Sequence, residues 1–433
     1  MPTARDLRVG TLESRADRAV RRGGCMRIVS LSPVVPYEGI PHAGGHYLLR
    51  HLRALRELGH RVTVVSFDDR ENRAAAESLA GLIDVVLVPE HPPHSPRTRR
   101  LLNAVERQEQ RLFPVRPVAR RRRALARSAA ARRALSTADA IEYQWTESGW
   151  LGLRRRPAGS AFHVVVAHDV VWQNYARFLS ATGAGWHPRA LLARWRRASV
   201  RRDERRIYRH ADAVVSFSGK DAALVGRVAG PSARAVVVRP PLADGSEISP
   251  RTGDPTPTVL FVGAFDRSVN AEAAVWTMTD IAPRVLAEHP DVRFVFAGAR
   301  PTPEMRRLAS ERPGSFWITG RVESLEPVYA TADAVLVPLR AGAGVKFKTV
   351  EAMVRGIPVV STGVGVEGIV DDRIRVFSVA DDARGLATGL LRALADPAAA
   401  RREALLVRDI VADEFSGNAF RRALAQVYRG ATP

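Results

Sequence analysis

Short apolar runs alternate with helix-like segments along nearly the whole chain, and the pattern begins a second time past its midpoint. The spacing predicts strands at residues 27–32, 61–67, 83–89, 138–144, 163–167, 213–218 and 235–241, and again at 258–263, 292–298, 315–320, 333–339 and 357–362. Strands that alternate with helices form parallel sheets with helices on both faces, so the sequence predicts an α/β fold with two Rossmann-like domains. Ligands of such sheets bind at the carboxyl ends of the strands, so we expect a central cleft between the domains.

The segment between the two halves lacks large apolar residues. Residues 240–258 are instead rich in proline, glycine, serine and aspartate, which is typical of an interdomain linker. The predicted division is a basic, disordered extension at 1–25, a domain at 26–240, a linker at 241–257, a second domain at 258–412, and a final helix within 413–433 that packs back towards the first domain. Met26, directly before the first strand, is a candidate start. Other helices are predicted at 270–288, at 349–356 and, for the last one, at 415–429.

The composition narrows the class of protein. The net charge is +21, and two arginine-rich stretches, 116–133 and 188–209, are predicted to be helical. Neither interleaves the aromatic residues and glycines of a nucleic-acid surface, so nucleic acid is an unlikely partner. A solvated face, or peripheral contact with an anionic membrane, remains open. With one cysteine and no apolar run long enough to span a bilayer, we expect a cytoplasmic location, with the inner face of the membrane as a further hypothesis.

The stretch AGAGVKFKTVEAM, residues 341–353, carries two of the three lysines in a chain with 66 lysines and arginines. Gly342 and Gly344 precede Lys346 and Lys348, and a helix is predicted to follow. A helix N-terminus presents free backbone N–H groups and a positive dipole end, which together with the lysines favour a phosphate or pyrophosphate. The stretch lacks the glycine-lysine-Ser/Thr ending of a P-loop.

The residues alone allow two roles for Glu351. Its carboxylate can accept hydrogen bonds from the two hydroxyls of a ribose. It can equally form a helix-surface pair with Lys348, three positions earlier, which would contribute only ~0.3 kcal/mol.

Residues 337–369 resemble the donor-binding signature of family 4 of the retaining GT-B glycosyltransferases. The likeness is most specific in the K-x-K-x-x-E-A-M run and the following G-x-P-V-V, and weaker likenesses occur at 36–45, 164–169, 203–218 and 261–276. The resemblance implies a GT-B architecture that binds a nucleoside-diphosphate sugar as substrate, with no cofactor.

The resemblance also implies roles for individual residues. Glu351 falls on the second carboxylate of the family's Glu-x7-Glu motif, which holds the ribose, whereas the first falls on Ala343. The family's usual arginine after the donor-domain strand falls on Ala264, and Arg267 is the expected replacement. Donor-binding residues are predicted to be Gly263, Gly342, Gly344, Val345, Lys348, Glu351 and Arg321, and catalytic residues Lys346, Arg267 and His168.

On the acceptor side, Gly44 and Gly45 are expected to form a loop near the donor phosphate or the acceptor, or else an ordinary turn that needs positive φ. His168 and Asp169 end a strand and are expected to point into the cleft. Two further residues receive structural roles. Asn270 is expected to cap the following helix, and Glu204 to pair with neighbouring arginines.

The function expected is retaining sugar transfer to an unknown hydroxyl acceptor. We find no acidic D-x-D pair for a divalent cation, so metal-independent transfer is predicted. Two alternatives remain from the sequence: a nucleotide-sugar epimerase of the same architecture, and a non-catalytic basic protein that binds nucleic acid or an anionic membrane.

Overall fold

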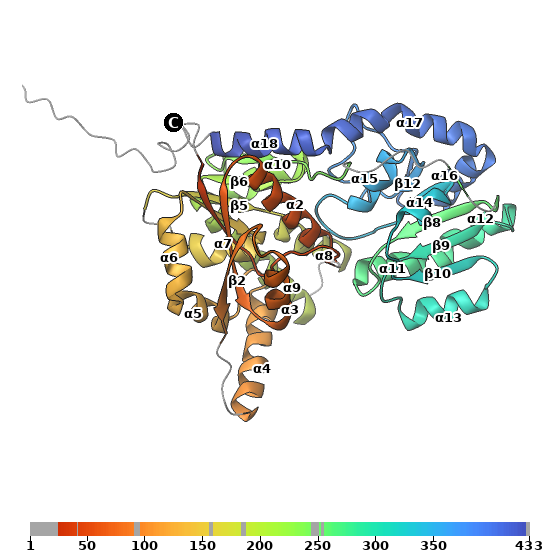
Figure 1. Cartoon of the computed structure of the whole chain (residues 1–433). Coiled ribbons are helices and arrows are strands. Elements are labelled where there is room, and N and C mark those ends of the chain that lie inside the picture. The colour runs from red at the N-terminus through yellow and green to blue at the C-terminus, as the bar shows by residue number, and fades with distance from the viewer. Residues whose placement is uncertain are drawn as a thin grey trace, which may run out of the picture.

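The computed structural model describes residues 25–40, 42–90, 96–155, 159–182, 188–243, 251–252 and 255–429. The predicted extension, all but its last residue, and most of the predicted linker lie outside these ranges. The chain folds into two α/β halves that lie side by side (Figure 1). Each half is built on one parallel sheet, as the sequence predicts.

The sheet of the N-terminal half has seven strands, all parallel. In their order across the sheet these are β3 (Asp84–Pro89), β2 (Arg61–Asp68), β1 (Arg27–Leu31), β4 (Ala140–Gln144), β5 (Phe162–Val166), β6 (Ala213–Ser216) and β7 (Ala235–Val237). The helices are α2 (Ala43–Glu57), α3 (Arg70–Ser78), α4 (Pro96–Leu112), α5 (Ala119–Arg127), α6 (Ala129–Thr137), α7 (Trp145–Leu153), α8 (Val171–Thr182), α9 (Pro188–His210) and α10 (Gly219–Ala229).

Strand β5 shows why this sheet is buried on both faces. Its residues alternate between two apolar clusters, with Val164 and Val166 in one and Val165 in the other. The first cluster contains residues of α2, and the second contains residues of α7 and α9. A strand covered on both sides needs apolar residues at every position, which explains the unbroken apolar runs in the sequence.

The sheet of the C-terminal half has six parallel strands. Across the sheet these are β10 (Phe316–Gly320), β9 (Arg293–Ala297), β8 (Thr258–Val262), β11 (Ala334–Val337), β12 (Val359–Ser361) and β13 (Ser378–Val379). The helices are α11 (Ser268–Trp276), the π-helical turn η1 (Thr277–Ile281), α12 (Ala282–Glu288), α13 (Pro303–Glu311), α14 (Glu326–Ala330), α15 (Phe347–Val354), α16 (Ala383–Ala395), α17 (Pro397–Glu414) and α18 (Gly417–Arg429).

Four details differ from the predicted elements. The two-residue strand β13 is too short to give an apolar run and was not predicted. The predicted helix at 270–288 begins two residues earlier and is interrupted by the π-helical turn η1. Helix α15 begins at Phe347 rather than at residue 349. The last helix begins at Gly417 rather than at residue 415, where the chain leaves α17.

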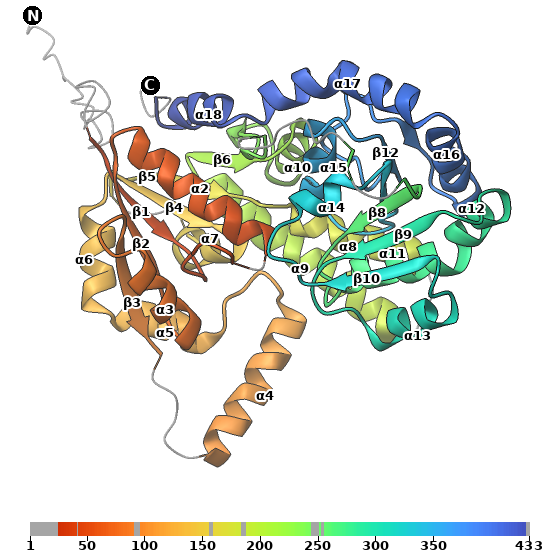
Figure 2. The ribbon, with the colours of Figure 1, turned by 45° about the vertical axis from the view of Figure 1, so that its right-hand side comes forward.

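The C-terminal helices cross from one half to the other. Helix α17 covers the C-terminal half, and α18 continues over the N-terminal half (Figures 1 and 2). Phe420 of α18 packs edge-on against Tyr47 of α2, with ring centroids 5.9 Å apart. The Tyr428 hydroxyl donates a hydrogen bond to the buried carboxylate of Glu142 in β4. Helix α18 is therefore part of the N-terminal core, although it follows the other half in sequence.

The strand order fixes where a ligand can bind. In each sheet, the direction of strand progression reverses between two neighbouring strands, β1 and β4 in one sheet and β8 and β11 in the other. Loops leave such a switch point in opposite directions and open a crevice at the carboxyl ends of the strands. The candidate residues after β1, β5, β8 and β11 all follow carboxyl ends of this kind.

Two further features concern surfaces. Helix α4 projects away from the body of the N-terminal half (Figure 2). In the described part of the chain, every helix is too short or too polar to cross a lipid bilayer.

The Glu142 contact predicts a cost for removing the Tyr428 hydroxyl. Burial alone would raise the pKa of Glu142, but His51, at 2.8 Å, and the Tyr428 hydroxyl bring it below its ordinary value of 4.5. Tyr428→Phe should lower the free energy of unfolding by about 1.5–3 kcal/mol, the usual contribution of a hydrogen bond to a charged group, while His51 and Gln144 keep their contacts with the carboxylate. Because the folded-state pKa is lowered, the loss should be full above about pH 4.5 and should shrink as the pH falls further.

Urea denaturation at pH 7 and at pH 3.5 measures this difference. Tyr37→Phe is the matched control, because its hydroxyl meets Glu71 at an exposed position, 3.3 Å away. Equal urea midpoints for the two variants would contradict a structural role for the Tyr428 contact.

Candidate functional site

The glycine-rich loop after β11, residues 338–346, lies against the N-terminal half. Gly342 and Gly344 have φ of 115° and 70°, values that favour glycine. A Cβ at Gly344 would lie only 3.0 Å from the carbonyl oxygen of His168, at the end of β5. The loop and the N-terminus of α15 therefore lie at the junction of the two halves rather than facing bulk solvent.

The side chain of Lys346 stabilises this loop by hydrogen bonds to carbonyl groups of the loop itself. It is only 9% exposed, and its Nζ donates to the carbonyl oxygens of Ala343 and Gly344, at 3.1 and 2.6 Å. Burial lowers the pKa of Lys346 to about 8, and the nearby Glu367 carboxylate opposes that fall. Lys346 is also the N-cap residue of α15, where no side chain caps the helix. The first backbone N–H groups of α15 thus have no side-chain partner at that cap.

Lys348 is held by the loop after β8. Its Nζ donates to Oδ1 of Asn270 at 2.9 Å and lies 5.0 Å from the centre of the Phe261 ring. Gly263 leaves room for it, since a Cβ there would lie 3.1 Å from Nζ. Burial, followed by the charge of Arg267, lowers the pKa of Lys348 to about 7. Two predicted donor-binding residues, Gly263 and Lys348, therefore lie close to the predicted catalytic residue Arg267.

The predicted helix cap at Asn270 is wrong. The N-cap position of α11 is Arg267, and the Asn270 side chain instead donates to the carbonyl oxygen of Ala264 at 2.8 Å while accepting from Lys348. An amide can donate and accept at once, and here one partner lies in the loop after β8 and the other in the first turn of α15. Asn270 of α11 therefore links the loop after β8 to α15.

Glu351 lies one turn further along α15. Its Oε2 accepts a hydrogen bond from the hydroxyl of the buried Tyr329 at 3.2 Å, while Lys348 is bonded to Asn270. The alternative pair of Lys348 and Glu351 is thus not the contact that either side chain makes. One carboxylate edge is fixed by Tyr329, and the ribose role of Glu351 stays a prediction.

The remaining donor-side residues differ in exposure. Arg267 and Arg321 are exposed, the first at the start of α11 and the second after β10. Burial and the Glu71 carboxylate raise the pKa of Tyr37 in the opposite half, and Arg321 opposes that rise, so Arg321 lies near the junction too. Val345 is buried in the core, so only its backbone can face a ligand.

Gly44 and Gly45 lie in the first turn of α2, which is next to His168 at the end of β5. Neither has positive φ, so the expectation of a turn that needs it is wrong. The reason for glycine is space. A Cβ at Gly44 would lie 2.8 Å from the Trp145 ring, and one at Gly45 would lie 2.4 Å from Ile40.

His168 is enclosed by aromatic rings. Trp145 stacks on it with ring centroids 4.1 Å apart, and Tyr47 and Phe217 meet it edge-on at 5.1 and 5.2 Å. Burial lowers the pKa of His168 to about 3, so the imidazole is neutral at pH 7. A neutral ring can donate one hydrogen bond and accept another, but it cannot supply positive charge. Burial and Asp221 raise the pKa of the adjacent Asp169.

Sequence reasoning missed Trp145 and misjudged Glu204. Trp145 has φ of 62°, which is uncommon outside glycine and occurs where the surrounding structure imposes it. Glu204 is fully buried and does not pair with the arginines of its helix. Its two oxygens accept from the backbone N–H groups of Val171 and Trp172, at 2.8 and 3.1 Å, so it caps α8. Burial raises the pKa of Glu204 to about 8.

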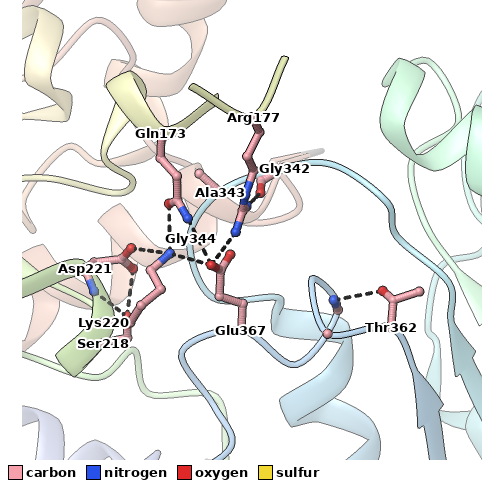
Figure 3. Close-up of polar contacts among 12 residues, drawn as sticks. Gln173, Arg177, Ser218, Lys220, Asp221, Gly342, Ala343, Gly344, Thr362 and Glu367 are labelled. Atoms are coloured by element: carbon pink, nitrogen blue, oxygen red, sulfur yellow. Dashed lines mark hydrogen bonds and ion pairs between the residues drawn. The ribbon is translucent and has the colours of Figure 1, made fainter. Parts of the chain in front are cut away.

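Sequence reasoning also missed a polar cluster that joins the halves (Figure 3). Glu367, in the turn after β12, accepts hydrogen bonds from Gln173 at 2.9 Å and from Arg177, both on α8. Lys220, at the start of α10, forms an ion pair with the same carboxylate at 3.2 Å. The only feature of this cluster that stands out in the sequence is the isolated Lys220. Its members on the N-terminal half precede Glu367 by 147 to 194 residues.

The described residues offer no cluster of three or more histidine, cysteine, aspartate or glutamate side chains that could hold a metal ion. The metal-independent character of the site remains a prediction.

The three lysines allow a direct test of the site's electrostatics. Lysine with 13C at Cε should give three resolvable NMR signals, assigned through Lys348→Arg and Lys346→Arg. We expect Lys348 to titrate near pH 7 and Lys346 near pH 8, because burial disfavours their charged forms. Arg267→Ala should raise the Lys348 midpoint by removing a like charge, while Arg300→Ala, an exposed control, should leave it unchanged. Titration of both lysines above pH 10 would contradict the described burial.

Comparison with known proteins connects this geometry to a family. Residues 256–396 match the family model of glycosyl transferases group 1, and residues 43–241 match that of the glycosyl transferase 4-like domain. Among solved structures, sucrose-phosphate synthase from Thermosynechococcus elongatus superposes with a TM-score of 0.66 at 20% identity, covering 93% of this chain and 98% of that one. Anabaena HepE, solved with UDP and glucose, superposes with a TM-score of 0.63 at 14% identity, covering 94% and 100%.

Curated relatives match over shorter stretches. A phosphatidyl-myo-inositol mannosyltransferase of Mycolicibacterium smegmatis is 31% identical over 161 residues, 36% of this chain and 39% of its own length. An uncharacterized 44.6 kDa protein from the cps region of Klebsiella pneumoniae is 29% identical over 130 residues, 29% of this chain and 34% of its own. The match thus spans little more than a third of either relative. The two family models together cover both sheets, and the fold is that of GT-B enzymes: the chain belongs to the glycosyltransferases of group 1.

Proposed function

We propose that this chain is a retaining, metal-independent glycosyltransferase that moves a sugar from a nucleoside-diphosphate sugar to a hydroxyl acceptor. One observation carries the proposal. The glycine-rich loop and the N-terminus of α15 meet the carboxyl end of β5, with Gly344 against the carbonyl oxygen of His168. A donor held by the first would present its sugar to the second.

The donor's diphosphate would meet converging positive charge. Lys346, Lys348, Arg267 and the N-terminus of α15 lie around one end of the C-terminal sheet. When the bond between the anomeric carbon and the diphosphate breaks, negative charge grows on the leaving phosphate. Groups already in place stabilise that charge without reorganising. The HepE structures with UDP and with UDP-glucose support a donor of this class.

Retention would follow from attack on the face that the diphosphate leaves. The acceptor hydroxyl forms the new bond to the anomeric carbon, and its proton passes to the departing phosphate oxygen. The neutral His168 ring can orient a sugar hydroxyl by hydrogen bonding, and Glu351 can hold the ribose hydroxyls. Closure of the two halves excludes water, which would otherwise hydrolyse the donor.

A membrane surface is the partner that the N-terminal half fits best. Arg202, Arg205, Arg206, Arg209 and His210 line a hollow of about 430 Å³ on α9. The projecting helix α4 exposes Leu101 and Val105, at 66% and 55%, beside its arginines. A basic surface with exposed apolar side chains suits the headgroup region of an anionic bilayer. Such contact would place the enzyme at the inner face of the membrane, near a lipid-linked acceptor.

Donor turnover tests the proposed activity. A panel of UDP-, GDP-, ADP- and dTDP-sugars is screened by thermal shift, and release of nucleoside diphosphate is measured with the best donor. Lys346→Ala should lower kcat/KM about 100-fold, comparable to loss of one oxyanion donor. Glu351→Ala should raise the donor KM about tenfold by removing a charged hydrogen-bond acceptor. Glu304→Gln, on the exposed face of α13, is the matched control.

Three results would contradict this assignment. Undiminished turnover in both variants would remove the site, and sugar isomerisation without any acceptor would indicate an epimerase. Absence of binding by every nucleotide sugar in calorimetry would favour the non-catalytic alternative.

Vesicle flotation tests the membrane contact. The protein should float with phosphatidylcholine vesicles that contain phosphatidylglycerol, and not with phosphatidylcholine alone. Replacing Arg205, Arg206 and Arg209 together by alanine should weaken binding by about 3 kcal/mol, roughly 1 kcal/mol for each arginine. Replacing Arg306, Arg307 and Arg312 by alanine makes the same charge change on the other half and should have no such effect. Equal losses would show that net charge, not this surface, drives binding.

A further inference from the structure

The contacts of Arg177 reach both sides of the donor loop. Its guanidinium donates one hydrogen bond to the carbonyl oxygen of Gly342 and another to the carboxylate of Glu367 (Figure 3). Arg177 belongs to the N-terminal half, whereas Gly342 and Glu367 belong to the C-terminal half. The loop is thus held by hydrogen bonds of its own Lys346 and also by a hydrogen bond from a side chain of the opposite half.

Both ends of this connection are anchored. On one side, the buried Glu204 fixes the first turn of α8, about one and a half turns before Arg177. On the other, Thr349 of α15 donates to the carbonyl oxygen of Gly365 at 2.8 Å, which holds the turn that carries Glu367. When the elements at both ends of a hydrogen bond are already fixed, less conformational freedom is lost as the bond forms. The position of one element then restricts the position of the other.

Lys220 and Gln173 complete the arrangement around Glu367. Lys220 Nζ contacts Oε1 of Gln173 at 2.9 Å and Asp221 at 2.8 Å, besides Glu367. Three donors from the N-terminal half therefore converge on one carboxylate of the C-terminal half. Burial would raise the pKa of Glu367, but Arg177 and Lys220 bring it below its ordinary value, so the carboxylate is ionised at pH 7.

We propose that Arg177 and Glu367 are positioning residues for the donor loop, which hold residues 341–346 in place only when the two halves are together. The inference rests on the proposed function for its catalytic consequence, though not for its structural one. Separation of the halves by a few ångströms breaks the contacts of Gln173, Arg177 and Lys220 with Glu367 and that of Arg177 with Gly342 at once, because these contacts cross the junction. The shape of the phosphate-binding loop is thereby coupled to exclusion of water from the donor.

Hydrogen exchange without any ligand tests the structural step. In Arg177→Ala, the amides of Thr349 and Val350, which donate to the carbonyl oxygen of Lys346 at the end of the loop, should exchange faster, on the order of tenfold, because local opening no longer breaks a charge-assisted bond. Glu367→Gln keeps the shape of the side chain but not its charge, and should give a smaller effect at the same amides. Glu304→Gln is the matched control and should match the wild type. Wild-type exchange at Thr349 and Val350 in both junction variants would overturn the proposal.

Donor turnover tests the catalytic step. Arg177→Ala should raise the donor KM and the ratio of donor hydrolysed to sugar transferred, while Arg177→Lys should restore part of both. The double variant of Arg177→Ala with Glu367→Gln should be no worse than Arg177→Ala alone, because the two residues act through one connection. An unchanged hydrolysis ratio with additive effects would overturn it. If no nucleotide sugar is turned over, the proposed function fails, and the exchange experiment still decides the positioning role.

A urea midpoint for each variant separates positioning from misfolding. Both side chains are partly exposed, so their replacement should leave the midpoint close to that of Glu304→Gln. A large drop restricted to the Arg177 and Glu367 variants would show that the connection supports the fold as a whole, which contradicts a role confined to the loop.

Discussion

The close approach of Gly344 to the carbonyl oxygen of His168 is the contact on which the rest of the site depends. It joins the carboxyl ends of two parallel sheets, and no side chain fits between them. Because strands of a parallel sheet all end at one edge, the loops after β1, β5, β8 and β11 reach the same space without any long excursion. The backbone geometry thus assembles the site, and side chains only adjust it.

Electrostatics at this junction is shaped by burial. His168 is neutral because aromatic rings surround it, whereas Lys346 and Lys348 keep pKa values of about 8 and 7 beside each other. An ammonium group whose pKa is lowered by burial has lost part of its hydration. A bound anion stabilises its charged form in place of the missing water. A diphosphate would raise both pKa values towards the charged form. Binding of the proposed donor would then offset the cost of burying these lysines.

The sequence predicted elements far better than it predicted contacts. Strands buried on both faces are continuous apolar runs, so twelve strands and both sheets could be read directly, and the two-residue β13 could not. Lys348 and Glu351 could be predicted as site residues because they share one short motif. By contrast, Glu204 stands among arginines in sequence, yet its side chain turns inward to cap α8. Asn270 precedes Lys348 by 78 residues, and Glu367 follows Arg177 by 190, separations at which no local pattern operates.

The different uses of arginine and lysine in this chain have a physical explanation. All three lysines of the chain, Lys220, Lys346 and Lys348, lie at this junction, whereas arginines occur both here and throughout the rest of the chain. Arginine stays charged in any protein environment, which suits permanent contacts such as that of Arg177 with Gly342 and Glu367. Lysine carries a compact charge whose pKa falls on burial, so its charge can respond to a ligand. A site that binds the proposed diphosphate would use both, with Arg177 in a permanent contact and with Lys346 and Lys348, whose pKa values burial lowers, as groups whose charge responds to the ligand.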